Sequence, residues 1–498
     1  MPRSSSRASS RRAVSDLVDR RIIGVETEFG VHYSHPGSRP LTPEEVARYL
    51  FRPVVEWGRS SNVFIPNGSR LYLDVGSHPE YATAECSTLD ELIATDKAGE
   101  IIMQRLIDSA TASMREDGFE GTIYLYKNNA DSAGNSYGSH ENYLIPRTVE
   151  FRRLSEALIP FLVTRQLYAG AGTWVTRPSE DAFGAAAQPH FAFSQRADHV
   201  WEGVSSATTR SRPIINTRDE PHADAADYRR LHVIVGDSNM SETTQLVRFG
   251  ATDLVLRMIE AGWSLGDHQM ENPIRSIRQV SHDLSGTAQL NLRSGRHRSA
   301  LQLQEHYLEQ ATRFVAAHGP HHDRVAAVLD LWERSLEAVR TQDFTGIDTE
   351  IDWAIKHRFL TRYRDRNGLA DDAPRLDQLD LSYHDITPGR GLFALLQSRG
   401  AAARVLTDDQ VQEAIDAPPS TTRACLRGRF ITEARAAGQE YSVDWTTLKF
   451  NDRPMMSVST KDPFATTSER LDELLATLPQ PSAADDPTRS GPSSIRPV

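Results

Sequence analysis

Residues 70–85, RLYLDVGSHPEYATAE, combine polar side chains with a strand-like pattern. Polar and apolar residues alternate in the first half, so a strand there would present three polar side chains on one face, those of Arg70, Tyr72 and Asp74. Two more carboxylates, Glu80 and Glu85, follow a Gly-Ser-His-Pro turn. Alternation alone is typical of an ordinary strand with a solvated charged face, whereas the added carboxylates favour a catalytic or cation-binding site.

A second pair of carboxylates lies in the segment GVETEFG at residues 24–30. Alternation would place Glu26 and Glu28 on the same face of a strand. Two carboxylates this close repel each other unless a positive charge lies between them, and Mg²⁺ prefers carboxylate oxygens as ligands. The pair therefore predicts a hard-cation site, and a solvated edge strand explains it equally well.

Three other segments carry polar groups that could contact a polar substrate or a nucleotide. The loop near residues 127–138 is followed by a strand-like segment, and together they hold Lys127, Asn128, Asn135, His140 and Glu141. A later cluster offers forked guanidinium donors for phosphate or carboxylate, although pairing with neighbouring acids explains it equally well; it comprises Arg210, Arg212 and Arg218. His232 is a secondary candidate, because a lone histidine in a strand is more often structural than a ligand.

The surrounding sequence predicts the elements that would position these groups. Thr42 and Thr88 each begin a capping-box pattern, so the acids that follow them have a structural explanation. Strands are predicted at residues 121–126 and 230–235, and helices at 151–167 and over most of 241–360. Glu80 and Thr83 fall on opposite faces of an ideal strand, so both serve one site only if Glu80 precedes the strand or a β-bulge intervenes.

Composition narrows the class of protein. A net charge of -11 argues against a general nucleic-acid binder, although a local basic groove stays possible. The absence of an apolar run near 20 residues argues against a membrane span. Two distant cysteines, Cys86 and Cys425, favour a reduced, cytoplasmic protein without disulfides. With no Walker-type loop and no Gly-x-Ser-x-Gly elbow, a nucleotide must be held in another way.

Changes in composition divide the chain into four parts. Residues 1–20 are rich in Ser and Arg and residues 478–498 in Pro and Ser, so both are predicted to be disordered tails. Between them, residues 21–417 form the expected main domain and residues 418–477 a small C-terminal domain, with a boundary at Pro418-Pro419. Trp445 in the small domain would pack in the interdomain core or stack on a planar ligand.

Several long motifs closely resemble the Pup-protein ligase, or proteasome accessory factor A, family of actinobacteria. They are residues 24–30, 70–85, 127–143 and 208–239, and the similarity runs from about residue 21 to about residue 465. This family belongs to the carboxylate-amine ligases, related to glutamine synthetase and glutamate-cysteine ligase. The resemblance implies an α+β fold, with a glutamine-synthetase-like, curved, mainly antiparallel sheet backed by helices and a small C-terminal domain.

The resemblance also implies a reaction and its residues. ATP would phosphorylate the side-chain carboxylate of the C-terminal glutamate of Pup, a small acidic ubiquitin-like modifier. A lysine amine of a target protein would then displace phosphate, marking the target for proteasomal degradation. Asp74 matches the family's catalytic base. The family's magnesium positions fall on Glu26, Tyr72 and Glu80, and its ATP positions on Arg70, Thr83 and Trp445.

Two alternatives share parts of this pattern. A paralogous Pup deamidase or depupylase has the same fold and hydrolyses the Pup linkage, but the segment between Gly30 and Arg70 predicts only a helix and connections, without that paralogue's long insertion. A non-catalytic Pup-binding adaptor is the other alternative, and retention of every expected polar residue argues against it. Because Pup is acidic and this chain is too, binding requires a local basic groove, for which the arginines at 210–218 are candidates.

Overall fold

The computed structural model describes residues 20–35, 41–74, 76–131, 134–176, 188–207, 212–453 and 455–479. Most of the two predicted tails, 1–20 and 478–498, therefore lies outside the described residues, as does Arg210. Within the described ranges, no helix combines the length and the hydropathy needed to span a bilayer.

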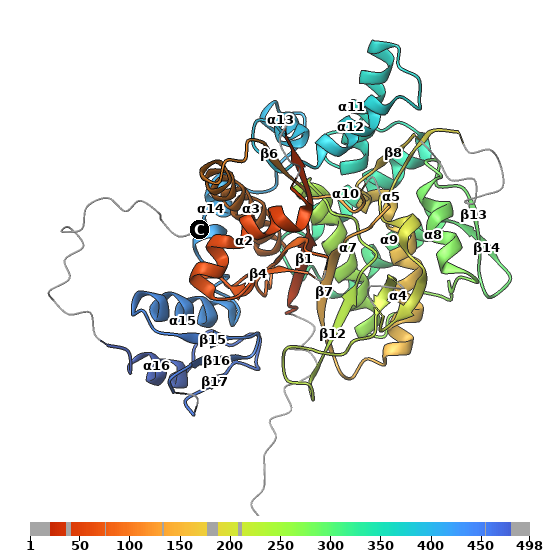
Figure 1. Ribbon diagram of the computed structural model, residues 1–498. Coiled ribbons are helices and arrows are strands. Elements are labelled where there is room, and N and C mark those ends of the chain that lie inside the picture. Colours follow the sequence, from red (N-terminus) through yellow and green to blue (C-terminus); the bar gives the residue numbers. More distant parts are fainter. Residues whose placement is uncertain are drawn as a thin grey trace, which may run out of the picture.

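A twisted sheet of eight strands runs through the centre of the molecule (Figure 1). Every neighbouring pair is antiparallel except β10 with β11. In spatial order the strands are β10 (Glu202–Ser205), β11 (Pro213–Asn216), β12 (Tyr228–Val233), β7 (Ser139–Pro146), β1 (Ile23–Glu28), β5 (Pro79–Ala82), β4 (Arg70–Leu73) and β3 (Asn62–Phe64). The predicted fold class, a mainly antiparallel sheet with helices packed against it, is confirmed.

One face of the sheet packs on a large helical core. Ile23 and Val25 of β1 and Tyr143 and Ile145 of β7 are buried in it, because alternate residues of a strand share a face. The helices of this core include α3 (Leu89–Glu116), α4 (Phe151–Thr164), α5 (Gln166–Ala169), α7 (Glu242–Glu260), α8 (Pro273–Ser281), α9 (Ala300–His318), α10 (Val325–Thr341) and α11 (Asp352–Asn367), and two later helices described below also add residues to it. The predicted helix at 151–167 is thus divided into α4 and α5.

A second core lies where α2 (Pro43–Gly58) packs on α3 and on the antiparallel pair of β2 (Gly30–Ser34) and β6 (Thr122–Tyr126). Both predicted capping boxes are present: Thr42 accepts from the backbone of Glu45, and Thr88 from that of Glu91. The acids at these helix starts therefore stabilise helix ends and lie apart from the polar face of the sheet.

The remaining elements cover the edges. They are the pairs β8 (Thr173–Val175) with β9 (His190–Ala192) and β13 (Gln289–Asn291) with β14 (His297–Ser299), the 3₁₀ turn η1 (Ala197–His199), and the helices α12 (Pro374–Tyr383), α13 (Leu392–Ser398) and α14 (Asp408–Asp416).

The last elements form a small cluster with a hydrophobic core of its own, drawn in blue in Figure 1. It comprises α15 (Ala424–Ala436), the sheet of β15 (Tyr441–Val443), β16 (Thr447–Phe450) and β17 (Val458–Ser459), and α16 (Glu469–Leu475). Phe64 of β3 belongs to the same core, so this C-terminal cluster packs directly on the edge of the large sheet.

Candidate active site

The face of the sheet opposite the helical core collects the polar residues. Along β1, Val25 and Thr27 are buried, whereas Glu26 and Glu28 are half-buried on the other face. The predicted alternation in this segment is therefore confirmed. Because strands β4, β5, β7 and β12 lie beside β1, their outward residues extend the same polar surface.

Strand register aligns Glu28, Glu80 and Tyr72 across β1, β5 and β4. The Tyr72 hydroxyl donates a hydrogen bond to Glu80 Oε1. Burial, together with the negative charges of Glu26 and Glu28, raises the pKa of Glu80 well above its usual range. Burial and the same kind of repulsion from Glu26 and Glu80 raise the pKa of Tyr72, so its phenol stays neutral.

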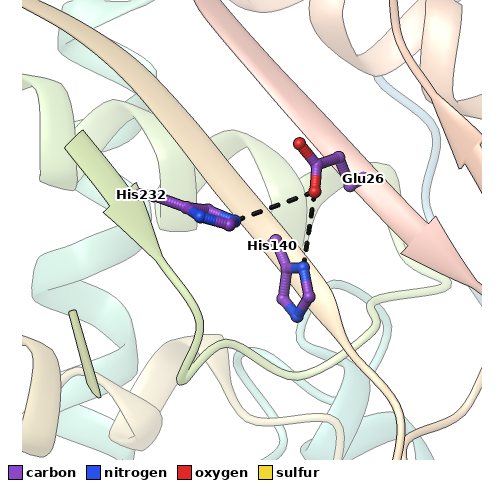
Figure 2. A group of neighbouring side chains, drawn as sticks. All are labelled: Glu26, His140 and His232. Atoms are coloured by element: carbon purple, nitrogen blue, oxygen red, sulfur yellow. Dashed lines mark hydrogen bonds and ion pairs between the residues drawn. The ribbon is translucent and has the colours of Figure 1, made fainter. Parts of the chain in front are cut away.

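One carboxylate oxygen of Glu26 points toward two neighbouring histidines, His140 of β7 and His232 of β12 (Figure 2). Its Oε2 is 3.4 Å from His140 Nδ1 and 3.7 Å from His232 Nε2, and its Oε1 is 3.6 Å from an Arg230 nitrogen. Burial disfavours the charged form, but the hydrogen bond with His140 and the nearby cation Arg230 hold the pKa of Glu26 well below its usual range. Burial lowers the pKa of His232 to about 3, so this imidazole is neutral at pH 7.

These groups form three overlapping sets of possible metal ligands, and in each set the ligand atoms all lie within 4.8 Å of one another. The sets are Glu26 with His140 and His232, Glu28 with Glu80 and His140, and Glu28 with Asp74 and His78. Three carboxylates whose mutual repulsion raises the pKa of Glu80 suit a hard divalent cation, which would relieve that repulsion. The donor set therefore fits Mg²⁺.

Asp74 lies at the end of this polar surface, in a tight turn rather than in a strand. We expected it to share a strand face with Tyr72, but β4 ends at Leu73, and Asp74 Oδ1 accepts from the backbone N–H groups of Gly76 at 2.7 Å and His78 at 2.9 Å. Burial opposes ionisation, but the hydrogen bonds with His78 and Gly76 lower the pKa of Asp74. The turn thus holds an ionised carboxylate beside Glu28.

A cavity opens next to Glu26, at the ends of β1, β5 and β7. Thr83 and Trp445, two of the predicted nucleotide positions, both line it. Thr83 follows the last residue of β5, and its hydroxyl accepts from the Val25 N–H at 3.0 Å. Glu80 lies within β5 rather than before it, and Thr83 lies beyond the strand end, so strand alternation does not set the face of Thr83.

Arg70 lies in the next row of the sheet, aligned through Ala82 with Glu26. Its guanidinium lies 4.7 Å from the centre of the Tyr72 ring, and its Nε donates to Asn62 at 2.6 Å. Arg70 is not among the residues lining the cavity, and its side chain lies near Asn62 and the rings of Tyr72 and Phe64.

Three residues that we grouped with the possible site have structural roles instead. Glu85 is buried between Arg423 and Arg427, which oppose the effect of burial and lower its pKa to about 2. Lys127 is buried in ion pairs with Asp96 and Glu100, and Glu141 in ion pairs with Arg165 and Arg248. The structural explanation is therefore favoured for these three residues, because each already has its counter-charge within the protein.

The predicted metal positions do not include His140, His232 or Glu28. Alternation had singled out Glu28, and both histidines occurred in strand-like segments, so the residue types were visible in the sequence. What the sequence lacked was the strand order β12-β7-β1, which brings residues more than a hundred positions apart within one site.

Fold and site together define an α+β enzyme with a carboxylate-lined antiparallel sheet, and comparison with known proteins places it in a family. The model of the family described as Pup-ligase protein matches residues 21–449. The Pup-protein ligase of Arthrobacter sp. (strain FB24) is 64% identical over 461 residues, covering 93% of this chain and 100% of the relative. That of Mycolicibacterium vanbaalenii is 55% identical with the same coverage.

Two solved structures agree with this result. A complex between prokaryotic ubiquitin-like protein Pup and its ligase PafA has a TM-score of 0.88 and 47% identity, covering 93% of this chain and 92% of the other. PafA in complex with ADP has a TM-score of 0.80 and 50% identity, covering 89% and 94%. The chain therefore belongs to the Pup ligase family.

Proposed function

We propose that this chain uses ATP to join the C-terminal glutamate of Pup to lysine side chains of target proteins. In the first step the γ-phosphoryl group of ATP is transferred to the glutamate side-chain carboxylate, and ADP leaves. In the second step the lysine nitrogen bonds to the acyl carbon, the bond from that carbon to the phosphate oxygen breaks, and phosphate leaves. The product is an isopeptide bond.

The observation that carries this proposal is the order of groups along one face of the sheet. The cavity lined by Thr83 and Trp445 lies next to Glu26. Glu28 and Glu80 come next along the sheet, and Asp74 lies at the far end. A nucleotide, a transferred phosphoryl group and an incoming amine would need sites in that spatial order. The family match, and the relatives' complexes with ADP and with Pup, support the use of a nucleotide and of Pup.

Glu26 and Glu80 would hold magnesium, and we add Glu28 to them because it lies in register with Glu80. The bound ion would supply positive charge to the phosphoryl oxygens. Tyr72 is the third position implied by the family resemblance. Its neutral hydroxyl is hydrogen-bonded to Glu80, so we propose that Tyr72 orients the Glu80 carboxylate.

Asp74 would accept the proton of the attacking lysine. Every hydrogen bond that the described residues give its side chain goes to Oδ1, which leaves Oδ2 for the substrate amine. A carboxylate with a lowered pKa is a weak base, but an amine becomes much more acidic as its nitrogen bonds to the acyl carbon. We therefore infer that the proton moves to Asp74 during or after attack.

Thr83 and Trp445 would contact the nucleotide in the cavity, and Arg70 would offset negative charge near the carboxylate row. The position of Arg70, aligned with Glu26 and apart from the cavity lining, favours a role toward phosphate.

Incubation with ATP, magnesium, Pup ending in glutamate and a lysine-bearing protein, followed by mass spectrometry, tests this function. We expect a conjugate whose mass is the sum of both proteins minus one water. Removal of Pup from a preformed conjugate, without formation of new conjugate, would instead identify a depupylase. No change in either substrate would contradict both enzymatic functions.

A further inference from the structure

The cavity beside Glu26 is also lined by a histidine that was not among the predicted site residues. His222, on the connection between β11 and β12, lines it together with Trp445 of the C-terminal cluster. The centres of the two rings are 5.9 Å apart and their planes differ by 33°. Two aromatic rings from distant parts of the chain therefore lie next to each other in the lining of one cavity.

The rest of the cavity lining combines apolar and charged side chains. Pro221 and Ala223 flank His222 in the chain, whereas Glu26, Arg230 and Arg423 carry charge. A flat, weakly polar group suits the aromatic and apolar part of the lining, and phosphates suit the guanidinium groups of Arg230 and Arg423. The lining thus offers both kinds of contact that a nucleotide needs.

Trp445 is held by its neighbours, and His222 lies on the connection between two strands. Trp445 packs edge-on against Phe64, with ring centres 4.8 Å apart, and the Arg427 guanidinium lies 5.0 Å from its ring centre. The backbone of His222 has a φ of 48°, a left-handed conformation that histidine adopts more readily than most residues. Burial, with the positive charges of Arg230 and Arg423, lowers the pKa of His222 to about 4, so its ring is neutral at pH 7.

We propose that His222 and Trp445 hold the purine base of the nucleotide between their rings. A base in contact with both rings requires about 7 Å between them, twice the usual carbon contact distance, so the pair opens by about 1 Å on binding. The nucleotide then bridges the large sheet, the β11–β12 connection and the C-terminal cluster. This inference rests on the proposed use of ATP and adds a second base-binding residue to it.

Calorimetric titration of the full chain with ADP and magnesium, without Pup, tests the inference on three variants. His222→Ala removes the ring, and His222→Phe keeps a flat ring without the nitrogens. His318→Ala is the matched control, because His318 also packs beside a tryptophan, Trp263, at 5.8 Å, but on α9 outside the cavity. Thermal melting of each variant verifies that it is folded.

We expect His222→Ala to weaken ADP binding about tenfold, the usual effect of losing one stacking partner of a base. His222→Phe and His318→Ala should stay within about twofold of the unsubstituted protein. Unchanged affinity in His222→Ala would overturn the inference, and so would equal losses in His222→Ala and His222→Phe, because stacking would then not be the interaction. Absence of ADP binding by the unsubstituted protein would contradict the proposed function itself.

Discussion

Asp74 is the residue on which the chemistry of the site depends most directly. We expect Asp74→Asn to keep the turn, because the amide oxygen can accept the same two backbone hydrogen bonds, but to lose the proton acceptor. Conjugation should slow by at least about 100-fold, the usual contribution of a positioned base, with ADP binding unchanged. Initial rates of conjugate formation measure this. Asp108→Asn, an exposed aspartate on α3, is the control, and a normal rate in Asp74→Asn would refute the base assignment.

Glu80 predicts an unusual dependence of stability on pH. Since its pKa is raised in the folded protein, its contribution to stability is complete below the pKa of an unfolded glutamate and is lost as pH rises through the raised value. Without divalent cations the melting temperature should therefore fall as pH rises above the range in which an unfolded glutamate titrates, and magnesium should restore most of it. Glu80→Gln should show a weaker pH dependence. A melting temperature that rises with pH in the metal-free protein would contradict the assignment.

Single residues were predictable where the chemistry lies within one segment. Alternation placed Glu26 and Glu28 on one face, and the structure confirms it. Alternation predicts that Asp74 belongs to the strand, because the pattern cannot show where strand pairing ends. The turn that begins at Asp74 is stabilised by the Asp74 side chain, which accepts hydrogen bonds from the backbone. The site-residue roles, including Tyr72 and Arg70, stay predictions until variants are measured.

Among the larger elements, the C-terminal cluster is attached to the sheet through buried charge. Glu85, which follows β5, accepts hydrogen bonds from Arg423 and Arg427 at the start of α15. Arg427 also contacts the Trp445 ring, so this ion-pair network links the sheet to one wall of the cavity. The sequence alone places Glu85 with the other carboxylates. Its partners Arg423 and Arg427 lie more than 300 residues away, and no local pattern indicates this pairing.

We expect Glu85→Gln to destabilise the protein by about 3–5 kcal/mol, because it leaves two buried guanidinium groups without their counter-charge. Since Trp445 would lose a fixed neighbour, ADP affinity should also fall. Chemical unfolding and calorimetry measure the two effects. Glu440→Gln is a matched control, because the Arg59–Glu440 pair joins the same two parts of the molecule but is exposed, and its loss should cost less than about 1 kcal/mol. Equal effects in both variants would contradict this role of burial.

For the whole molecule, the fold class followed from motifs long enough to resemble a known family, whereas the strand order that assembles the site did not follow from pattern. The proposed division at residues 417 and 418 stays a prediction. The separate hydrophobic core of the C-terminal cluster is consistent with it, but Glu85, Arg423 and Arg427 join the two parts through buried contacts.

The overall charge of -11 has a consequence for binding an acidic partner. Attraction to Pup must come from a local basic surface, such as the exposed Arg218 near His222, and local attraction is screened by salt. We expect the affinity for Pup to weaken at least about fivefold between 50 mM and 500 mM sodium chloride, as the Debye length shortens. Fluorescence anisotropy of labelled Pup measures this. Affinity insensitive to salt would show that charge is not a substantial part of recognition.

The central claim is that the glutamate carboxylate is activated by phosphorylation before the lysine attacks it. It is tested most directly by labelling the side-chain carboxylate of the C-terminal glutamate of Pup with oxygen-18 and analysing the inorganic phosphate released during conjugation. A γ-glutamyl phosphate requires one labelled oxygen in each phosphate, because the bridging oxygen leaves with phosphorus. Unlabelled phosphate released alongside conjugate would contradict the mechanism.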